Sequence, residues 1–345
     1  MTAASNDPLG VGIIGAGFMG QTYARTVQDL VPGAQVAGVA GGSRAPDLAK
    51  EYNVPCFDSY KDLVQDARID LVCVATPHAY HAEQALAAAR AGKHLLVDKP
   101  MATTLEDCDA ILDVCREKDL KCSVTFTQRL RVGFAKTFEV LSSGRLGKVQ
   151  TIRTYQMVPG GMDVVPGWQM QPENVGLLIG HGIHNFDAIR ALTGREIATV
   201  YAKSRTLADA PVEGTTDAIL TLDDGTVHYL FCSFEVPQPG FPRSGMGARI
   251  VCEKGLIDLD AYAETRVAYD GGDWEVLAQQ PKIDWAGKGY LDPTRLECYA
   301  ALLLDLVSCI RTGEQTIVTG WDGRQAVAAA LAAYESSRTG CEVQL

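Results

Sequence analysis

The sequence lacks any excess of basic charge, and this bears on its partners. It has 31 lysines and arginines against 42 aspartates and glutamates, which gives a formal net charge of −11 over 345 residues. Binding to nucleic-acid phosphates needs a concentrated basic face. We therefore expect no nucleic-acid partner.

Long hydrophobic runs are also missing. The longest apolar stretches, such as residues 300–307, are broken by charge before the roughly 20 residues that a membrane-spanning helix needs. Residues 1–8 have neither the basic nor the apolar region of a secretory signal. We expect a cytoplasmic protein that does not associate with membranes.

Paired cysteines are absent too. None of the ten cysteines belongs to a Cys-x-x-Cys pair, although Cys108, Cys115 and Cys122 recur every seven residues. In a reducing compartment such residues are mostly small buried hydrophobes. We favour that interpretation over disulfides or a zinc site.

At 345 residues the whole chain is longer than one hydrophobic core usually supports, so we expect two domains. Its first third alternates short apolar strands with helices. Strands are predicted at residues 11–14, 35–40, 70–75 and 94–97, with helices at 21–30, 45–52, 60–66 and 79–91. Such alternation is typical of an α/β domain whose parallel sheet is covered on both faces.

After about residue 123 the pattern changes to period-two alternation. Strands are predicted at residues 149–157, 199–204, 216–222, 226–234 and 248–259, and helices at 293–312 and 321–339. Asp223-Asp224-Gly225 between two strands predicts a hairpin turn. We expect an α+β domain over residues 124–345, with a large, mostly antiparallel open sheet. Helices would cover one face, and an uncovered apolar face predicts a homodimer or homotetramer.

A glycine motif gives the first domain a function. Gly15-Ala16-Gly17-Phe18-Met19-Gly20 follows a strand and opens a helix, the context in which Gly-x-Gly-x-x-Gly marks a dinucleotide site. The glycines permit a tight turn, close approach of a pyrophosphate, and close helix packing. We therefore predict a doubly wound Rossmann domain over residues 1–123.

The end of the second strand bears on the choice of cofactor. An NAD site usually has a carboxylate there for the ribose 2′-hydroxyl, whereas this chain has Ala40-Gly41-Gly42-Ser43-Arg44. Ser43 can donate a hydrogen bond, and the Arg44 fork suits phosphate oxygens. This favours NADP(H) over NAD(H). Alternatively, Arg44 is simply solvated and NAD binds without the usual carboxylate.

Several motifs together carry a resemblance that spans nearly the whole chain. They are the glycine motif, Ala75-Thr76-Pro77-His78-x-x-His81, Asp98-Lys99-Pro100, residues 143–147, Gly182-Ile183-His184-x-x-Asp187, and residues 320–323 with 335–336. The chain resembles the glucose–fructose oxidoreductase and inositol dehydrogenase (Gfo/Idh/MocA) family. That resemblance implies an NAD(P)-dependent oxidoreductase acting on CH–OH groups of a sugar, polyol or related cyclic diol.

The resemblance also implies roles for individual residues. Thr76 and Pro77 would lie beside the nicotinamide, Lys99 would contact cofactor and substrate, and His184 would face the substrate. Gln128 and Arg129 match a position near both. The expected cofactor-binding set is Gly15, Gly17, Phe18, Met19, Gly20, Ser43, Arg44, Ala75, Thr76, Pro77, His81, Asp98, Lys99 and Gln128.

Lys99 also has a physical argument of its own. It follows a predicted strand at the carboxyl edge of a parallel sheet, where such folds bind ligands. The positive charge of an oxidised nicotinamide disfavours a nearby ammonium and lowers its pKa. Lys99, on this argument, and His184, on the resemblance, are the expected catalytic residues.

The stretch from Ile179 to Asp187 holds His181 and His184, two of only six histidines. The spacing predicts that both lie on one helix face, with Asp187 one turn further on. The family places an aspartate four residues before the histidine that matches His184, where this chain has Gly180. His181 is then either a replacement substrate contact or a structural histidine.

The remaining expected substrate contacts are Arg129 and Trp168. Trp168 follows a loop rich in glycine and proline, residues 158–167, that would overhang the cleft. Its ring would either stack on the apolar face of a sugar or anchor the loop. Gln128 and Arg129 would otherwise form an exposed helix start.

Two other functions compete with the dehydrogenase. One is a non-catalytic cofactor-binding sensor of the same fold, which the presence of both Lys99 and His184 disfavours. The other is a metal-dependent hydrolase using His181 and His184. It is disfavoured because no further ligands with metal-binding spacing lie near them, so we expect no metal.

Overall fold

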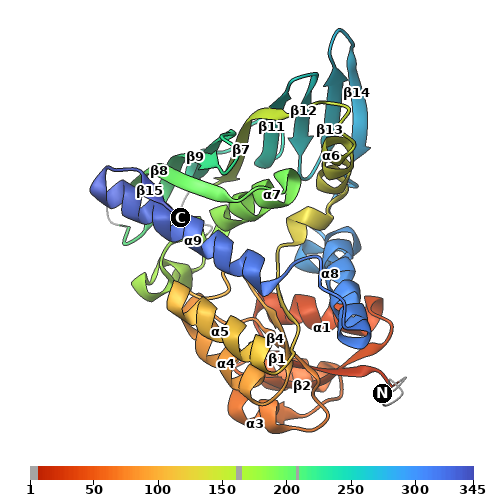
Figure 1. The fold of residues 1–345 in the computed structure, drawn as a ribbon. Helices are drawn as coiled ribbons and strands as arrows, with labels where there is room; N and C mark the ends of the chain where they lie inside the picture. Colours follow the sequence, from red (N-terminus) through yellow and green to blue (C-terminus); the bar gives the residue numbers. More distant parts are fainter. Residues whose placement is uncertain (1–6, 161–164, 207–209) are drawn as a thin grey trace. The chain divides into compact units, whose positions relative to one another are not determined.

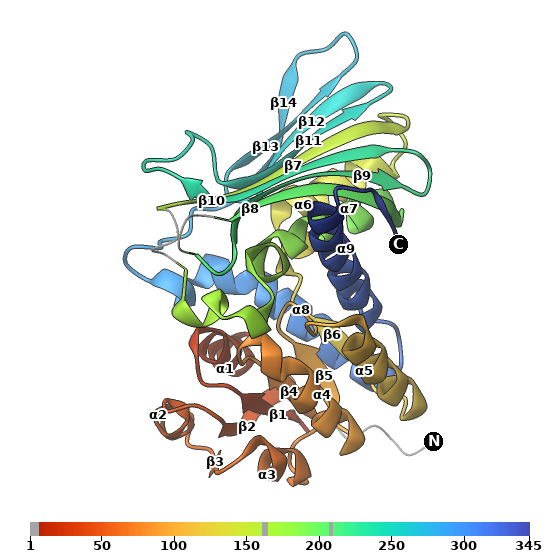
Figure 2. The same ribbon diagram turned by 90° about the vertical axis from the view of Figure 1, so that its left-hand side faces the viewer.

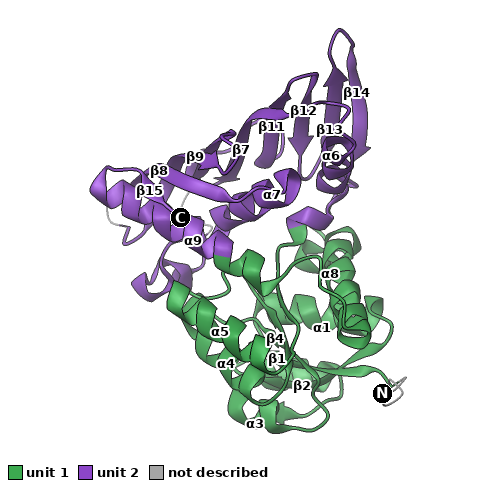
Figure 3. Ribbon diagram, in the orientation of Figure 1, with its two compact units in different colours: residues 1–127, 283–324 green, residues 128–282, 325–345 purple. Residues whose placement is uncertain are grey.

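The computed structural model describes residues 7–160, 165–206 and 210–345. It forms two compact units: Met1–Thr127 with Ile283–Arg324, and Gln128–Lys282 with Gln325–Leu345 (Figure 3). This differs from the continuous division into 1–123 and 124–345 that the sequence predicted. Residues 283–324 return to unit 1 because helix α8 (Pro293–Thr312) packs against helix α1 (Phe18–Leu30).

Unit 1 contains a six-stranded sheet in the order β3-β2-β1-β4-β5-β6, and all its strand pairs are parallel. The strands are β1 (Leu9–Ile14), β2 (Ala34–Ala40), β3 (Cys56–Phe57), β4 (Leu71–Val74), β5 (His94–Val97) and β6 (Cys122–Val124). The other helices are α2 (Ala45–Glu51), α3 (Tyr60–Gln65), α4 (His81–Arg90) and α5 (Leu105–Glu117) (Figure 1). Strand β4 is buried along its whole length, as expected of a central strand in a doubly wound sheet.

Unit 2 contains a nine-stranded sheet in the order β14-β13-β12-β11-β7-β10-β9-β8-β15. The strands are β7 (Val149–Pro159), β8 (Ile197–Thr206), β9 (Glu213–Leu222), β10 (Val227–Val236), β11 (Met246–Cys252), β12 (Gly255–Asp260), β13 (Glu264–Tyr269), β14 (Trp274–Gln279) and β15 (Val343–Gln344). The β7–β10 pair is parallel and the other pairs are antiparallel. The mostly antiparallel sheet is confirmed, as is the hairpin turn before Gly225, whose φ is +86°.

The sequence interpretation of this sheet did not include β13, β14 or β15, and one of its predicted strands was wrong. Residues 248–259 were predicted as one strand, but the chain turns back at Glu253 and Lys254 to form the β11–β12 hairpin. Gly255 ends the turn with a φ of +157°, and a Cβ there would lie 2.3 Å from the carbonyl oxygen of Ala268. The two charged residues that interrupt the apolar alternation were the local sign of this turn.

Helices cover one face of the large sheet. They are α6 (Val132–Ser142), α7 (Ile183–Thr193) and the part of α9 (Gly320–Thr339) from Gln325 onward (Figure 2). The outward-pointing positions of the strands carry large exposed side chains such as Tyr201, Ile219 and Tyr229. A groove of about 630 Å³ lies among them. Among the described helices, none combines the length and the apolar character needed to cross a bilayer.

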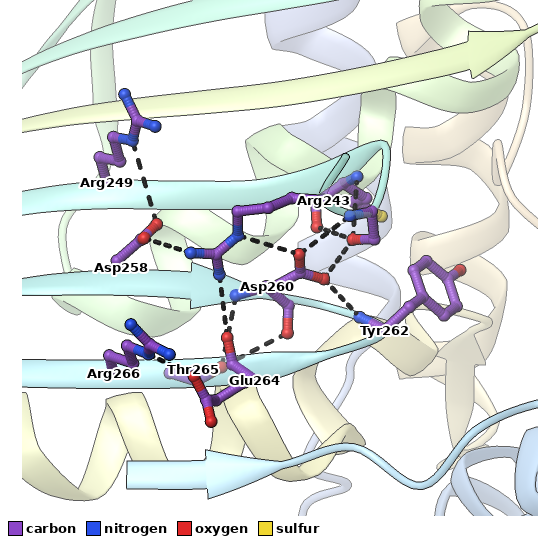
Figure 4. A network of polar contacts seen from close by, with 10 residues as sticks. Arg243, Arg249, Asp258, Asp260, Tyr262, Glu264, Thr265 and Arg266 are labelled. Carbon is purple, nitrogen blue, oxygen red and sulfur yellow. Dashed lines mark hydrogen bonds and ion pairs between the residues drawn. The ribbon is translucent and has the colours of Figure 1, made fainter. Parts of the chain in front are cut away.

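One rim of this groove is fixed by a buried carboxylate. Asp260 is fully buried and accepts hydrogen bonds from the backbone N–H groups of Ser244 and Tyr262, each at 3.0 Å (Figure 4). It also bonds the Ser244 hydroxyl, while Arg243 bonds Asp258 on the same strand. The segment before β11, which carries Phe241 and Arg243, is therefore tied to β12.

Candidate functional site

The glycine turn of unit 1 is built by close backbone contact. Gly15 has a φ of +98°, and a Cβ there would lie 2.6 Å from the carbonyl oxygen of Ala75. A Cβ on Gly20 would lie 1.9 Å from the carbonyl oxygen of Gly15. The first and third glycines are therefore required for the turn and for the packing of α1. Gly17 is open, since a Cβ there would meet only Arg44 Nη2, at 3.5 Å.

The start of helix α1 suits an anion. Gly17 provides no side-chain cap, and the first turn contains no acidic residue. The first backbone N–H groups of a helix have no partner within the helix and lie at the positive end of its dipole. The open space at Gly17 lets a ligand approach them, so the donor set fits the pyrophosphate of a dinucleotide.

Ser43 and Arg44 lie at the end of β2 and are both exposed. Gly41 and Gly42, with φ of +84° and +83°, turn the chain there, and Ala16 N–H donates to Gly41 O at 3.3 Å. Because Arg44 Nη2 lies 3.5 Å from the position of a Cβ on Gly17, its guanidinium is beside the glycine turn. The structure thus places Arg44, predicted to bind a 2′-phosphate, beside Gly17 of the turn predicted to bind the pyrophosphate.

His81 joins the two other turns at this edge of the sheet. Its Nε2 lies 2.7 Å from Thr76 O, after β4, and its Nδ1 lies 2.7 Å from Pro100 O, after β5. The ring is fully buried, so His81 links the two segments from behind. Burial lowers the pKa of His81, although the Asp98 carboxylate opposes this. His81 was expected to contact cofactor; in this structure its two ring nitrogens face the carbonyl oxygens of Thr76 and Pro100, and the protonated nitrogen donates a hydrogen bond to one of them.

The neighbouring residues of these turns are held in place locally. Thr76 donates from Oγ1 to Gln84 Oε1 at 2.6 Å. The Asp98 carboxylate accepts the backbone N–H of Lys99 at 2.9 Å. Lys99 is partly buried, and burial lowers its pKa while Asp98 opposes that effect. A lysine with a lowered pKa at the end of β5 is suited to exchanging protons.

In unit 2, the stretch with His181 and His184 is not a regular helix. Leu178–Gly182 forms a π-helical turn, and α7 begins at Ile183. His181 therefore lies in the π turn and His184 in the first turn of α7, instead of in one regular α-helix. Gly182 permits this turn, because a Cβ there would lie 2.6 Å from Leu178 Cδ1 and 3.1 Å from Cys232 Sγ.

Long-range hydrogen bonds hold the π turn. Leu178 N–H donates to Glu213 Oε1 at 2.6 Å, and Ile179 N–H donates to the Tyr334 hydroxyl at 3.3 Å. That hydroxyl donates to the same Glu213 oxygen at 2.6 Å. Burial raises the pKa of Glu213. Sequence inspection missed Glu213 and Tyr334 because each lies far along the chain from the turn, with no local motif.

The members of the histidine motif have separate partners. His181 Nε2 lies 2.8 Å from Gln169 Oε1, and its ring meets the edge of Phe234 at a centroid distance of 4.7 Å. Asp187 is fully buried, and its carboxylate accepts hydrogen bonds from two nitrogens of the Arg129 guanidinium, Nε at 2.9 Å and Nη2 at 2.5 Å. Asp187 is thus neutralised by Arg129, while His184 lies partly exposed in the first turn of α7.

Gln128 and Trp168 were the other predicted contacts in unit 2. Gln128 is buried: its Nε2 donates to the Tyr262 hydroxyl at 3.3 Å, and its Oε1 accepts from Arg131 Nε at 3.0 Å. Its amide thus bonds other residues of unit 2. Trp168 lies in a short 3₁₀ turn with a 37% exposed side chain, and residues 161–164 of the preceding loop lie outside the described residues.

No metal centre is found within residues 7–160, 165–206 and 210–345, where no three His, Cys, Asp or Glu side chains gather suitably. The ten cysteines are free thiols. The geometry of the glycine turn and the start of α1 supports dinucleotide binding in unit 1, and Lys99 and His184 are titratable side chains of the two units.

Comparison with known proteins agrees with this geometry. Residues 9–126 match the oxidoreductase family with an NAD-binding Rossmann fold, and residues 134–258 match the GFO/IDH/MocA C-terminal domain. The chain is 29% identical to inositol 2-dehydrogenase 2 of Saccharopolyspora erythraea, over 96% of this chain and 94% of that protein. It is 26% identical to the scyllo-inositol 2-dehydrogenase (NAD(+)) of Bacillus subtilis, over 96% and 95% of the two chains.

A solved structure shares the fold. The aldose-aldose oxidoreductase of Caulobacter crescentus, crystallised with glycerol, superimposes with a TM-score of 0.83 at 24% identity, over 98% of this chain and all of that one. The matches to both domains agree with the structure, which has the glycine turn in unit 1 and the nine-stranded sheet in unit 2. The chain belongs to the GFO/IDH/MocA oxidoreductase family, with an NAD-binding Rossmann domain.

Proposed function

We propose that this protein is an NAD(P)-dependent dehydrogenase that interconverts a secondary alcohol and a ketone on a sugar, polyol or related cyclic diol, in the cytoplasm. The observation that carries the proposal is Lys99, partly buried at the carboxyl end of β5 with its pKa lowered by burial. The names of the inositol dehydrogenase relatives support the substrate class.

Each residue then has a specific task. The bound dinucleotide supplies hydride transfer. The turn from Gly15 to Gly20 holds the pyrophosphate, and Thr76 and Pro77 border the nicotinamide half. Lys99 contacts cofactor and substrate, and either Lys99 or His184 takes the hydroxyl proton during oxidation. Trp168 and His181 are proposed to contact substrate, while Arg129 acts through its pair with Asp187.

Substitutions test the proton carriers. Lys99→Ala and His184→Asn should each lower kcat by about 100-fold or more, the scale of a lost acid–base group. Lys118→Ala, which changes an exposed lysine of the same unit, should leave kcat unchanged. The assay is turnover of inositols and aldoses with NAD+ or NADP+. Near-normal turnover in either variant would remove that residue from the mechanism. Dinucleotide binding without turnover of any sugar would favour the non-catalytic sensor.

We further propose a preference for NADP(H), from the position of Arg44 beside Gly17. Arg44→Ala should weaken NADPH binding by about 10- to 100-fold, the range for a hydrogen bond to a charged group. NADH binding should change by less than about twofold. Arg90→Ala, also exposed in unit 1, is the control. Equal losses for both cofactors, or a wild-type preference for NADH, would overturn the assignment.

Finally, we propose that a second copy of the chain covers the open face of the large sheet in a homodimer or homotetramer. Tyr201, Ile219 and Tyr229 are 37–44% exposed there, so contact would remove apolar surface from water. Arg153, Lys203 and Asp217 line the same groove, so two copies can pair opposite charges. Ile219→Glu should give monomers in sedimentation, whereas Phe138→Glu on α6 should not. A monomeric wild type at micromolar concentration would refute this.

A further inference from the structure

A buried arginine lies directly behind the glycine turn of unit 1. Arg295, near the start of α8, has only 4% of its surface exposed. It comes 275 residues after Gly20 in the chain, yet its guanidinium Nη2 lies 3.7 Å from the sulfur of Met19. Met19 and Phe18 are the two residues between the second and third glycines, so Arg295 meets the turn at its variable positions.

Hydrogen bonds connect this guanidinium to the backbone of the turn. Nη1 donates to Thr22 Oγ1 at 3.2 Å, and Thr22 Oγ1 in turn donates to the carbonyl oxygen of Phe18 at 3.1 Å. Nη1 also donates to the Tyr290 carbonyl at 2.7 Å, and Nη2 to the Tyr299 hydroxyl at 2.8 Å. The guanidinium therefore fixes the first turn of α1 from behind.

Aromatic rings surround the same charge. The guanidinium carbon lies 4.9 Å from the ring centroid of Phe18, 5.6 Å from that of Tyr290 and 4.5 Å from that of Tyr299. Phe18 and Tyr290 are themselves in contact, with ring centroids 3.6 Å apart. Among the described residues, no carboxylate forms an ion pair with Arg295. Rings and neutral oxygens therefore stabilise the cation, and its charge is not cancelled.

This arrangement has an electrostatic consequence for the turn. A buried charge acts at lower dielectric than one in water, so its field reaches further. The helix α1 N-terminus, which faces the same turn, is also positive. A ligand with negative phosphates at the turn would complement both, whereas a neutral ligand would gain nothing from Arg295.

We propose that Arg295 is a positioning residue for the dinucleotide. It holds Phe18 and Met19 in place for the pyrophosphate and adds positive potential behind the turn. This inference rests on the proposed dinucleotide binding. Arg295 would act on the pyrophosphate that NADH and NADPH share. Its substitution should therefore change the affinity for both cofactors equally, in contrast to Arg44.

The test compares two arginines on one helix. Arg295→Met and Arg295→Lys are measured against Arg311→Met. Arg311 is exposed on the last turn of α8 and donates to the carbonyls of Gly33 and Asp7, away from the glycine turn. The measurements are the Kd for NADH and NADPH from nicotinamide fluorescence, and the KM for dinucleotide and for sugar. Urea unfolding without cofactor gives the stability of each variant.

Arg295→Met should raise the Kd of both cofactors by about 10- to 100-fold, the range for bonds from a charged group. The KM for sugar should stay unchanged. Arg295→Lys should recover part of the affinity, because it restores the charge but not the fork. Arg311→Met should leave both Kd values unchanged.

A purely structural role gives a different result. In that case Arg295→Met lowers the free energy of unfolding, but the folded fraction binds both cofactors with the wild-type Kd, and this would overturn the inference. If Arg295→Met does not fold, Arg295→Lys decides: a wild-type Kd overturns the inference, and a raised Kd supports it. Loss of affinity for one cofactor alone would also overturn it. A wild-type protein that binds neither cofactor would overturn the proposed function as well.

Discussion

The glycine turn of unit 1 and the π turn of unit 2 are built in opposite ways. In the glycine turn, side chains are absent so that backbone can approach backbone, as when Gly20 meets the Gly15 carbonyl. In the π turn, backbone groups depend on the buried Glu213 and Tyr334. A local turn can be recognised from a short motif, whereas a turn held by remote polar groups cannot. The two should therefore respond differently to substitution.

The largest effect is expected where a remote polar pair is broken. Asp187→Ala would leave the Arg129 guanidinium, 15% exposed, without its buried carboxylate partner. Removing one member of a buried pair costs about 3–5 kcal/mol of unfolding free energy. Urea denaturation would measure this loss. The Lys136–Glu139 pair on the surface is the control, since Glu139→Ala should cost less than about 1 kcal/mol. Similar losses for both pairs would show that the buried Arg129–Asp187 pair contributes no more to the unfolding free energy than an exposed pair.

The next effect concerns the glycine turn. Gly20→Ala would place a Cβ 1.9 Å from the Gly15 carbonyl oxygen, so α1 or the turn must move. Overpacking of this kind costs about 1–3 kcal/mol, and dinucleotide binding should fall with it. Gly17→Ala is the matched control, because that position is open and its φ of −73° suits alanine. It should keep the stability and weaken only binding. Wild-type cofactor affinity in both variants would contradict the role of the turn.

A more limited effect, on stability and kcat but not on dinucleotide binding, is expected from Tyr334→Phe, which removes the hydroxyl shared by Glu213 and Ile179 N–H. Leaving buried polar groups unsatisfied costs about 1–3 kcal/mol. Since the hydroxyl holds the π turn ahead of His184, kcat should fall while the Kd for dinucleotide stays constant. Stopped-flow binding and steady-state assays separate the two quantities. An unchanged kcat would mean that α7 keeps its position without this bond.

The effect that is smallest at neutral pH comes from a buried histidine, because its contribution appears only in acid. Burial lowers the pKa of His228 to about 3, and its Nε2 lies 2.7 Å from Thr154 Oγ1. The unfolded chain, with a histidine pKa of about 6.5, binds the proton first. The unfolding free energy should therefore be flat above pH 6.5 and fall by about 1.4 kcal/mol per pH unit below it, toward pH 3. His228→Gln should reduce this slope by that amount. Equal slopes in wild type and variant would show that His228 protonates without unfolding.

The same contrast between local and remote contacts explains which helices and strands could be predicted from the sequence. Helix α8 matches its predicted bounds of 293–312, and β5 matches 94–97, because local propensity and capping define both. Asp292, for example, caps α8 by accepting N–H bonds from Thr294 and Arg295. The predicted strand over 248–259 was wrong because its period-two pattern was followed across Glu253 and Lys254, where the chain reverses into the β11–β12 hairpin.

The candidate site divides in the same way. The glycine turn, Arg44 and Lys99 were predicted from motifs, since each is placed by the strand that it follows. The contacts that His81, Gln128 and Arg129 make could not be predicted, because each involves a distant partner such as Pro100, Tyr262 or Asp187. Burial of these side chains forces such pairing, and spacing along the chain does not record it.

The sequence by itself determined the two kinds of sheet, the glycine turn and the family, because periodicity and short motifs are local properties. Only the tertiary structure decided that residues 283–324 join unit 1, that Arg295 lies behind the glycine turn, and that the π turn precedes α7. Each of these depends on buried contacts between residues far apart in the chain, which spacing along the sequence does not record.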